Sequence, residues 1–143
     1  MNKFLGIDPG RGKTGLALVK DDGIVLKLLV AATEDLESAL DGFVGAEQLS
    51  GAVIGDGTNS STVASLVKKL FTGLPVYMVN EAHSTEEARQ LYWEANPPRG
   101  LKRLLPRGLL VPDEPLDAYA AVVQVRRFLK EENKNSGGSH AIQ

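Results

Sequence analysis

The sequence contains no cysteine and only two histidines, His83 and His140, among its 143 residues. Without cysteine there is neither a disulfide framework nor a thiolate metal site. Two imidazoles are too few for a histidine-rich zinc site. A metal ion in this protein would therefore be held mainly by oxygen ligands, which favours hard cations such as Mg²⁺ or Mn²⁺.

Long apolar runs are also missing. No run approaches the roughly 20 residues that a transmembrane helix needs, and the N-terminus lacks the charge and hydropathy pattern of a signal peptide. We therefore expect no membrane partner and a cytoplasmic location. The apolar share of 43% and the charged share of 24% are typical of globular proteins. We expect one folded domain over residues 1–132 and a disordered tail over residues 133–143, which are rich in Asn, Ser and Gly.

The charge is small in total but uneven along the chain. A net charge of −2 argues against a protein that coats nucleic acid without specificity. Residues 1–98 hold eight Lys or Arg against thirteen Asp or Glu, whereas residues 99–130 hold seven against three. A basic C-terminal third on an acidic body is compatible with a phosphate-binding face. A solvated helix face followed by a basic loop explains it equally well.

Hydrophobic periodicity and turn residues predict five strands and four helices. The predicted strands are residues 3–8, 14–20, 24–32, 52–55 and 75–80. The predicted helices are residues 33–48, 61–71, 84–95 and 116–130. Thr33 is expected to cap the first helix, and the residues Asp21-Asp22-Gly23 form a hairpin turn. Residues 96–112 contain four prolines and no clear period, so they are expected to form a loop.

This order of elements predicts an α/β fold. Three meandering strands pair antiparallel, and two later strands, each preceded by a crossover helix, pair parallel. The result is a mixed five-stranded sheet flanked by helices. Sites in such sheets collect at the carboxyl ends of the parallel strands. Because Asp8 ends the first strand and Asn80-Glu81 ends the fifth, both are expected to lie over one crevice.

Four motifs, in order over residues 4–129, resemble those of a known nuclease superfamily. The first, residues 4–10 (FLGIDPG) followed by 14–17 (TGLA), is similar to the first strand and hairpin of the RuvC and YqgF/RuvX nucleases. Residues 54–58 (IGDGT) and 79–82 (VNEA) resemble the YqgF-like domain of the Tex transcription accessory proteins. Residues 117–121 (DAYAA) are similar to the Asp-x-x-Ala-Ala helix start of YqgF proteins.

The resemblance implies a ribonuclease H-like fold and a metal-dependent endonuclease. Its substrate would be structured nucleic acid, either Holliday junction DNA or precursor ribosomal RNA. Asp8, Glu81 and Asp117 would be the catalytic carboxylates and would hold Mg²⁺ or Mn²⁺, with two ions expected for two-metal phosphodiester hydrolysis. Where many YqgF proteins carry Asp-Glu-Arg, this chain has Asn80-Glu81-Ala82, which removes one carboxylate and one arginine.

Each of these acids also has an ordinary structural explanation. Asp8 can initiate the Pro-Gly turn that follows it. Glu81 and Asp117 can each offset the positive N-terminal end of a helix. Asp113 and Glu114 are close enough in sequence to take the place of Asp117.

Candidate nucleic-acid-binding residues are basic side chains, together with the glycine-rich loop 55–62, whose following helix amides favour an anion. They are Arg11, Lys13, Thr58, Arg99, Lys102, Arg103 and Arg107. An ordinary strand-to-helix turn explains the loop as well. Tyr92 and Trp93 have the chemistry to stack on bases, but packing of a helix on the sheet explains them more simply.

Two classes of function stay open at this point: a metal-dependent endonuclease, and a non-catalytic nucleic-acid-binding module of the same fold. Both imply a nucleic-acid partner and a monomer or homodimer. The residues 6–10 (GIDPG) also resemble the phosphate motif of actin-like ATPases. That class needs two such domains around a cleft, and 143 residues provide one.

Overall fold

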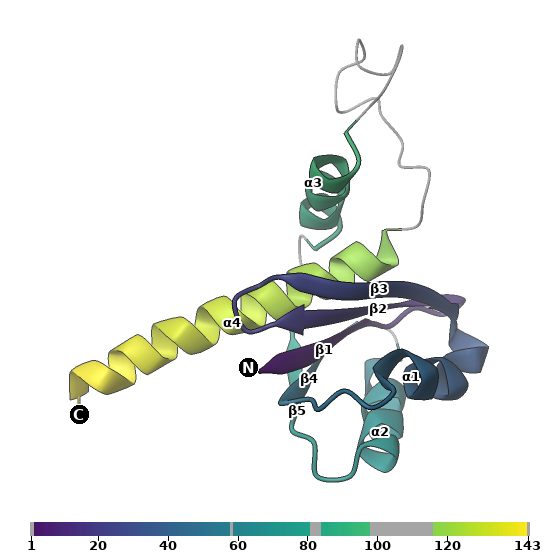
Figure 1. The fold of residues 1–143 in the computed structure, drawn as a ribbon, viewed down its shortest axis with the longest axis horizontal. Helices are drawn as coiled ribbons and strands as arrows, with labels where there is room; N and C mark the ends of the chain where they lie inside the picture. The colour runs from purple at the N-terminus through teal and green to yellow at the C-terminus, as the bar shows by residue number, and fades with distance from the viewer. Residues whose placement is uncertain (1, 58, 81–83, 98–115, 143) are drawn as a thin grey trace.

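Five strands form one mixed sheet in the computed structural model, which describes residues 2–57, 59–80, 84–97 and 116–142. The order across the sheet is β3-β2-β1-β4-β5 (Figure 1). The β1–β2 and β2–β3 pairs are antiparallel, and the β1–β4 and β4–β5 pairs are parallel. The expected fold class is confirmed. The strands are β1 (Lys3–Asp8), β2 (Lys13–Lys20), β3 (Val25–Ala32), β4 (Gly51–Gly55) and β5 (Val76–Val79).

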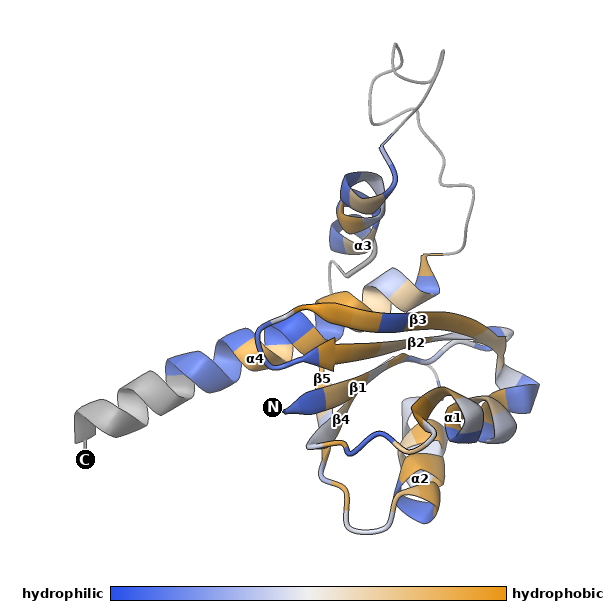
Figure 2. Ribbon diagram, viewed as in Figure 1, coloured by the Kyte–Doolittle hydropathy of each residue, from blue (hydrophilic) through white to orange (hydrophobic). Residues whose placement is uncertain are grey.

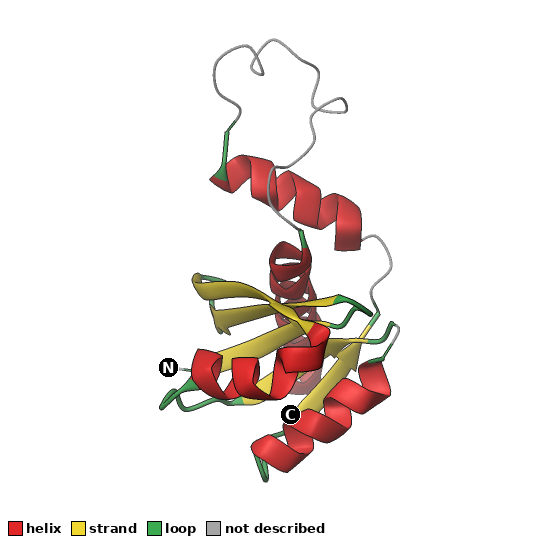
Figure 3. Cartoon of the chain, turned by 90° about the vertical axis from the view of Figure 1, so that its right-hand side faces the viewer, coloured by secondary structure: helices red, strands yellow, loops and turns green. Residues whose placement is uncertain are grey.

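Helices cover both faces of this sheet, with α1 and α2 on one side and the long α4 on the other (Figures 1 and 3). The helical elements are η1 (Thr33–Asp35), α1 (Leu36–Val44), α2 (Ser60–Leu70), α3 (Ser84–Ala95) and α4 (Asp117–Ile142). Within the described ranges, no helix is both long enough and apolar enough to cross a membrane.

Burial on both faces explains why the three central strands, β1, β2 and β4, are continuous apolar runs rather than alternating ones. In β1, Leu5 and Ile7 pack toward α1 and α2. Phe4, on the opposite face, packs with Val122 and Val125 of α4. The apolar residues therefore follow the strands through the centre of the molecule (Figure 2).

The hairpin between β2 and β3 forms where Asp21-Asp22-Gly23 predicts it. Gly23 has φ +90°, a conformation that glycine adopts without steric cost. The Asp22 carboxylate accepts a hydrogen bond from the Ile24 amide at 3.0 Å. This turn returns the chain directly along β2.

The first helix differs from the prediction at both ends. Thr33 is not a cap: it is the first residue of η1, and its hydroxyl donates to the Gly10 carbonyl at 2.8 Å. The helix ends at Val44 rather than residue 48, because Gly45 turns the chain with φ +56°.

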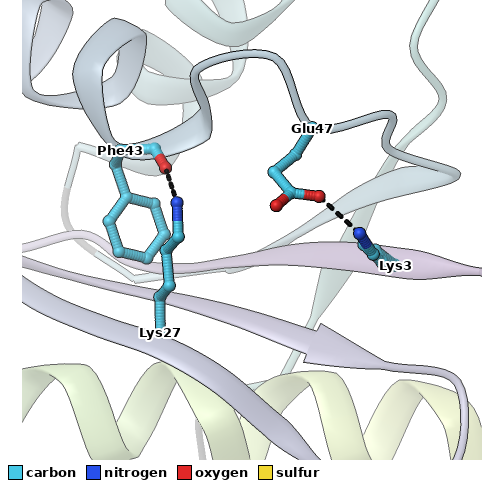
Figure 4. A network of polar contacts seen from close by, with 4 residues as sticks. All are labelled: Lys3, Lys27, Phe43 and Glu47. Carbon is cyan, nitrogen blue, oxygen red and sulfur yellow. Dashed lines mark hydrogen bonds and ion pairs between the residues drawn. The ribbon is translucent and has the colours of Figure 1, made fainter.

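Two lysines of the sheet tie the end of α1 to the strands (Figure 4). Lys27 of β3 donates to the Phe43 carbonyl at 3.2 Å, which satisfies one of the unpaired carbonyls of the last helical turn. Lys3 of β1 forms an ion pair with Glu47, in the loop after α1. This ion pair lowers the pKa of the Glu47 carboxyl, through the hydrogen bond from Lys3 and its positive charge.

Tyr92 and Trp93 pack in the interior, as core packing predicts. Both are about 95% buried, at 4% and 5% exposure. Tyr92 makes edge-on contacts with Trp93 and with Tyr119 of α4. These aromatics help to hold α3 on α4, so their faces are not displayed for stacking on bases.

The helix α4 is drawn through residues 133–142, as far as Ile142. The expectation that these residues, rich in Asn, Ser and Gly, form a disordered tail stays a prediction.

Candidate metal-binding site

Polar residues follow the carboxyl ends of all three parallel strands. Asp8 ends β1, Asp56 follows β4 and Asn80 follows β5. The register pairs Ile7 with Ile54, and the Asp56 amide donates to the Val79 carbonyl of β5 at 2.9 Å. The expected polar edge therefore exists in the structure. Asp8 is half-buried there, whereas Asp56 and Asn80 are exposed.

Glycines in the three central strands let α4 lie almost on the sheet. A Cβ at Gly6 would lie 2.6 Å from the Ala121 carbonyl oxygen, and one at Gly15 would lie 2.0 Å from that of Asp117. Any other residue at these positions would push the helix away. Because Gly15 is paired with Asp8 across β1 and β2, the first turn of α4 lies next to the strand position of Asp8. The fold thus brings Asp8 and Asp117, 109 positions apart in sequence, to one corner.

Gln124 is the residue of this site that sequence reasoning missed. Its Nε2 donates to Asp8 Oδ1 at 3.0 Å, and the side chain is fully buried. Gln124 lies seven residues after Asp117, two helical turns along the same face of α4. A polar residue in the otherwise apolar run Val122-Val123-Gln124-Val125 was the signal available in the sequence.

The turn after β1 is tied to two other elements. The Gly10 carbonyl accepts hydrogen bonds from Thr33 Oγ1 at 2.8 Å and from Asn59 Nδ2 at 3.5 Å. Asn59 directly precedes α2 and has φ +66°, a left-handed conformation that asparagine tolerates. Arg11 and Lys13, both exposed, therefore flank a turn that is anchored beside the N-terminus of α2.

A third link joins α4 to β5 and α3. The Arg127 guanidinium donates to the Asn80 carbonyl at 3.0 Å and to Glu87 Oε1 at 2.8 Å. These two partners lie on either side of residues 81–83, which include Glu81 and are outside the described residues.

The remaining site predictions also fall outside the described residues: Thr58, Arg99, Lys102, Arg103 and Arg107. Among the residues that the structure does describe, no group of three His, Cys, Asp or Glu could hold a metal ion. A site of three carboxylates needs Glu81, so that assignment stays a prediction. The two acids that are described, Asp8 and Asp117, offer the oxygen ligands that hard cations prefer.

No protein family model and no curated protein sequence matches the chain. Solved structures do. The structure of Thermus thermophilus RuvC matches with a TM-score of 0.59 at 15% identity, covering 92% of this chain and 96% of that one. The Fowlpox virus resolvase, in a complex with Holliday junction DNA, also has a TM-score of 0.59, at 10% identity, covering 90% and 97%.

The chain has the ribonuclease H-like fold. Identities of 10–15% establish this fold and nothing finer. A second Thermus thermophilus RuvC structure, in complex with a Holliday junction substrate, agrees, with a TM-score of 0.56 over 87% of this chain and 90% of that one. In this fold, Asp8, Asp56 and Asn80 lie at the carboxyl ends of the parallel strands, which we call the carboxyl edge of the sheet. The first turn of α4 lies beside this edge.

Proposed function

We propose that this protein is a metal-dependent endonuclease that cuts branched DNA of the Holliday junction type. The observation that carries the proposal is the meeting of Asp8 and the first turn of α4 at the carboxyl edge of β1, with Gln124 bonded to the Asp8 carboxylate. The similar folds of RuvC and the Fowlpox virus resolvase, both found in complexes with Holliday junctions, support the choice of substrate.

Asp8, Glu81 and Asp117 are the proposed ligands for two Mg²⁺ or Mn²⁺ ions. Asp8 comes from a central strand, Asp117 from a helix start, and Glu81 follows β5. Such carboxylates from separate elements can converge on one point. Bound divalent cations would activate the attacking water and stabilise the leaving oxygen. The hydrogen bond from Gln124 to Asp8 and the close approach of α4 to the glycines of β1 and β2 support this assignment.

The proposed substrate-binding residues are basic side chains and one threonine, of which Arg11 and Lys13 lie among the described residues. Arg11 and Lys13 lie on the anchored turn after β1, and Thr58 belongs to the loop before α2. Arg99, Lys102, Arg103 and Arg107 lie between α3 and α4 in the sequence. Arginine and lysine at such places hold backbone phosphates and set the position of the substrate without reading its sequence.

A YqgF-type nuclease that processes precursor ribosomal RNA is the second candidate, favoured by the motifs at residues 54–58, 79–82 and 117–121. A non-catalytic nucleic-acid-binding module, like the YqgF-like domain of Tex proteins, is a third, since Asn80 stands where many relatives carry an acid.

One experiment separates these possibilities. Purified protein is incubated with labelled four-way junctions, linear duplex of the same sequence and precursor ribosomal RNA, in Mg²⁺, Mn²⁺ or EDTA. We expect cleavage of the junction with either metal and none in EDTA. Cleavage of the RNA alone would favour the second candidate. Binding without cleavage, unchanged when all three acids are replaced, would contradict an enzyme and favour the module.

A further inference from the structure

Gln124 has a contact pattern that is unusual for a buried amide. It is fully buried on the face of α4 that Ala121, Val122 and Val125 pack against the sheet. Buried amides normally pair both of their polar atoms. Here Nε2 donates to Asp8, and Oε1 has no hydrogen-bond partner among the residues that the structure describes. A reversed amide would bring Oε1 against the carboxylate, oxygen against oxygen, so the contact with Asp8 itself determines how the amide is turned.

Gly55 provides the space in which this side chain lies. A Cβ at residue 55 would lie 2.5 Å from Gln124 Nε2 and 2.9 Å from its Cδ. Both distances are far below van der Waals contact. The amide of Gln124 therefore lies against the backbone of Gly55 and reaches Asp8 only because residue 55 is glycine. Three positions on three elements, Asp8 on β1, Gly55 on β4 and Gln124 on α4, together make this single contact.

We propose that Gln124 is a positioning residue that holds the Asp8 carboxylate in the orientation in which it binds a divalent cation. This rests on the proposed function, because its target is the role of Asp8 as a metal ligand. Metal-binding carboxylates are commonly hydrogen-bonded by a second residue, whose loss lowers metal affinity or activity about 10–100-fold. An ionised carboxylate has about four acceptor positions, so one amide hydrogen bond is compatible with a cation.

The neutrality of the donor supports this role. A lysine or arginine at residue 124 would also hold Asp8, but its positive charge would repel the cation. An amide orients the carboxylate and leaves its negative charge in place. A residue that only stabilised a half-buried acid would not need to be uncharged.

The test is the substitution Gln124→Met, which keeps the length of the side chain and removes the donor. Mn²⁺ binding is measured by calorimetry on the full chain, and the melting temperature is measured without metal. We expect the Kd for Mn²⁺ to rise about 10–100-fold, while the metal-free melting temperature stays the same or rises, because the unpaired Oε1 is also removed. Gln90→Met, the same change at an exposed position of α3, is the matched control and should leave the Kd unchanged.

Two further variants test whether Gln124 acts through Asp8. In an Asp8→Asn background, Gln124→Met should weaken Mn²⁺ binding much less than it does in the wild type, since coupled residues are non-additive. Gly55→Ala should also weaken Mn²⁺ binding, as Gln124→Met does. In this variant residue 124 is still glutamine, but the new methyl group would push its amide away from Asp8.

The outcomes distinguish the two proposals. Wild-type protein that binds no Mn²⁺ would overturn both the proposed function and the role of Gln124 in it. Wild-type binding with the same Kd in Gln124→Met would overturn the Gln124 role alone. A lower melting temperature with an unchanged Kd would show that Gln124 only supports the packing of α4.

Discussion

Asp8 is subject to three different demands at the end of β1. A turn into Pro9-Gly10 needs a short side chain with a hydrogen-bond acceptor, and metal binding needs a negative charge. The contact from Gln124 Nε2 needs only an acceptor oxygen. An asparagine satisfies the first and the third of these demands and fails the second, so a single substitution separates them.

We expect Asp8→Asn to lower metal-dependent cleavage at least ~10²-fold, the scale seen when one strong transition-state stabiliser is lost. Its metal-free stability should hold or improve, because the Asn side chain can still accept from Gln124 and a charge close to Asp117 is gone. Cleavage of a labelled junction and thermal unfolding measure the two effects. Marked destabilisation with intact cleavage would instead identify Asp8 as a turn residue.

At the scale of elements, the position of α4 depends on what the strands lack. Gly6, Gly15 and Gly55 all face this helix, and a Cβ added at any of them would lie 2.0–2.6 Å from an atom of α4. The helix therefore packs on backbone rather than on side chains, which places its first turn beside Asp8. Elsewhere on the same face, Ala17, Val19 and Val53 supply the ordinary apolar contacts.

Gly6→Ala should therefore destabilise the protein by about 1–3 kcal/mol, the usual cost of overpacking. The new methyl group would meet the Ala121 backbone, which cannot move without shifting all of α4. Gly42→Ala is the control of opposite sign. Gly42 is exposed in α1, and a Cβ added there would meet no atom of the described residues within 4 Å. Alanine at this position should therefore stabilise by roughly 0.5–1 kcal/mol. Denaturant unfolding of both variants measures the difference, and equal stabilities would contradict the close approach of α4.

The loop after α1 gives a prediction for pH. Lys3 lowers the pKa of Glu47 in the folded protein, so this carboxyl contributes stability above its unfolded pKa of about 4.3. That contribution is lost as the pH falls through the lower, folded value. In Glu47→Gln, the fall in stability over this acid range should be shallower than in the wild type. Lys3→Met should have the same effect on its own. In the double variant with Glu47→Gln, it should change the dependence of stability on pH little further. An unaltered acid profile in both would show that the ion pair does not form in solution.

At the scale of the whole molecule, the acidic and basic parts of the chain are separated. Seven of the sixteen Lys and Arg residues lie within residues 99–130. The segment that joins α3 to α4 carries four of them, at positions 99, 102, 103 and 107, which are outside the described residues. Both helices that it joins are held close to the carboxyl edge. The first turn of α4 lies on Gly15 at Asp117, and α3 is linked to α4 by the ion pair between Glu87 and Arg127.

If this basic segment holds phosphates, changing Lys102, Arg103 and Arg107 together to Ala should flatten the salt dependence of duplex binding. Each lost phosphate contact removes roughly 0.9 from the slope of log affinity against log salt, so three contacts remove about two to three units. Lys68→Ala with Lys69→Ala, in the last turn of α2, is the control and should leave the slope unchanged. Binding titrations at several salt concentrations give the slope. An unchanged slope in the triple variant would mean that this segment is only solvated, and that binding must be sought around Arg11 and Lys13.

Local patterns in the sequence were sufficient for the elements and the fold class. Each of these patterns depends only on residues that are close in sequence. Examples are the apolar run ending at Asp8, the Asp21-Asp22-Gly23 turn and the periodic residues of α2 and α3. For that reason their predicted bounds agree with the structure to within about one residue. The polar edge followed too, because parallel strands must end at the same side of a sheet. The motifs at residues 4–17 and 117–121 are by themselves enough to indicate the ribonuclease H-like fold.

Tertiary structure decided the contacts between residues far apart in the sequence. Thr33 satisfies the Gly10 carbonyl rather than a helix end, since that carbonyl lies within reach only after folding. In the sequence, Gln124 is one polar residue in an apolar helix. Only in the folded protein does its side chain lie against Gly55 and donate a hydrogen bond to Asp8. Such contacts depend on which glycine faces which helix turn. Periodicity identifies the face of an element that is buried, but the partner that this face meets is set by the packing of the whole chain.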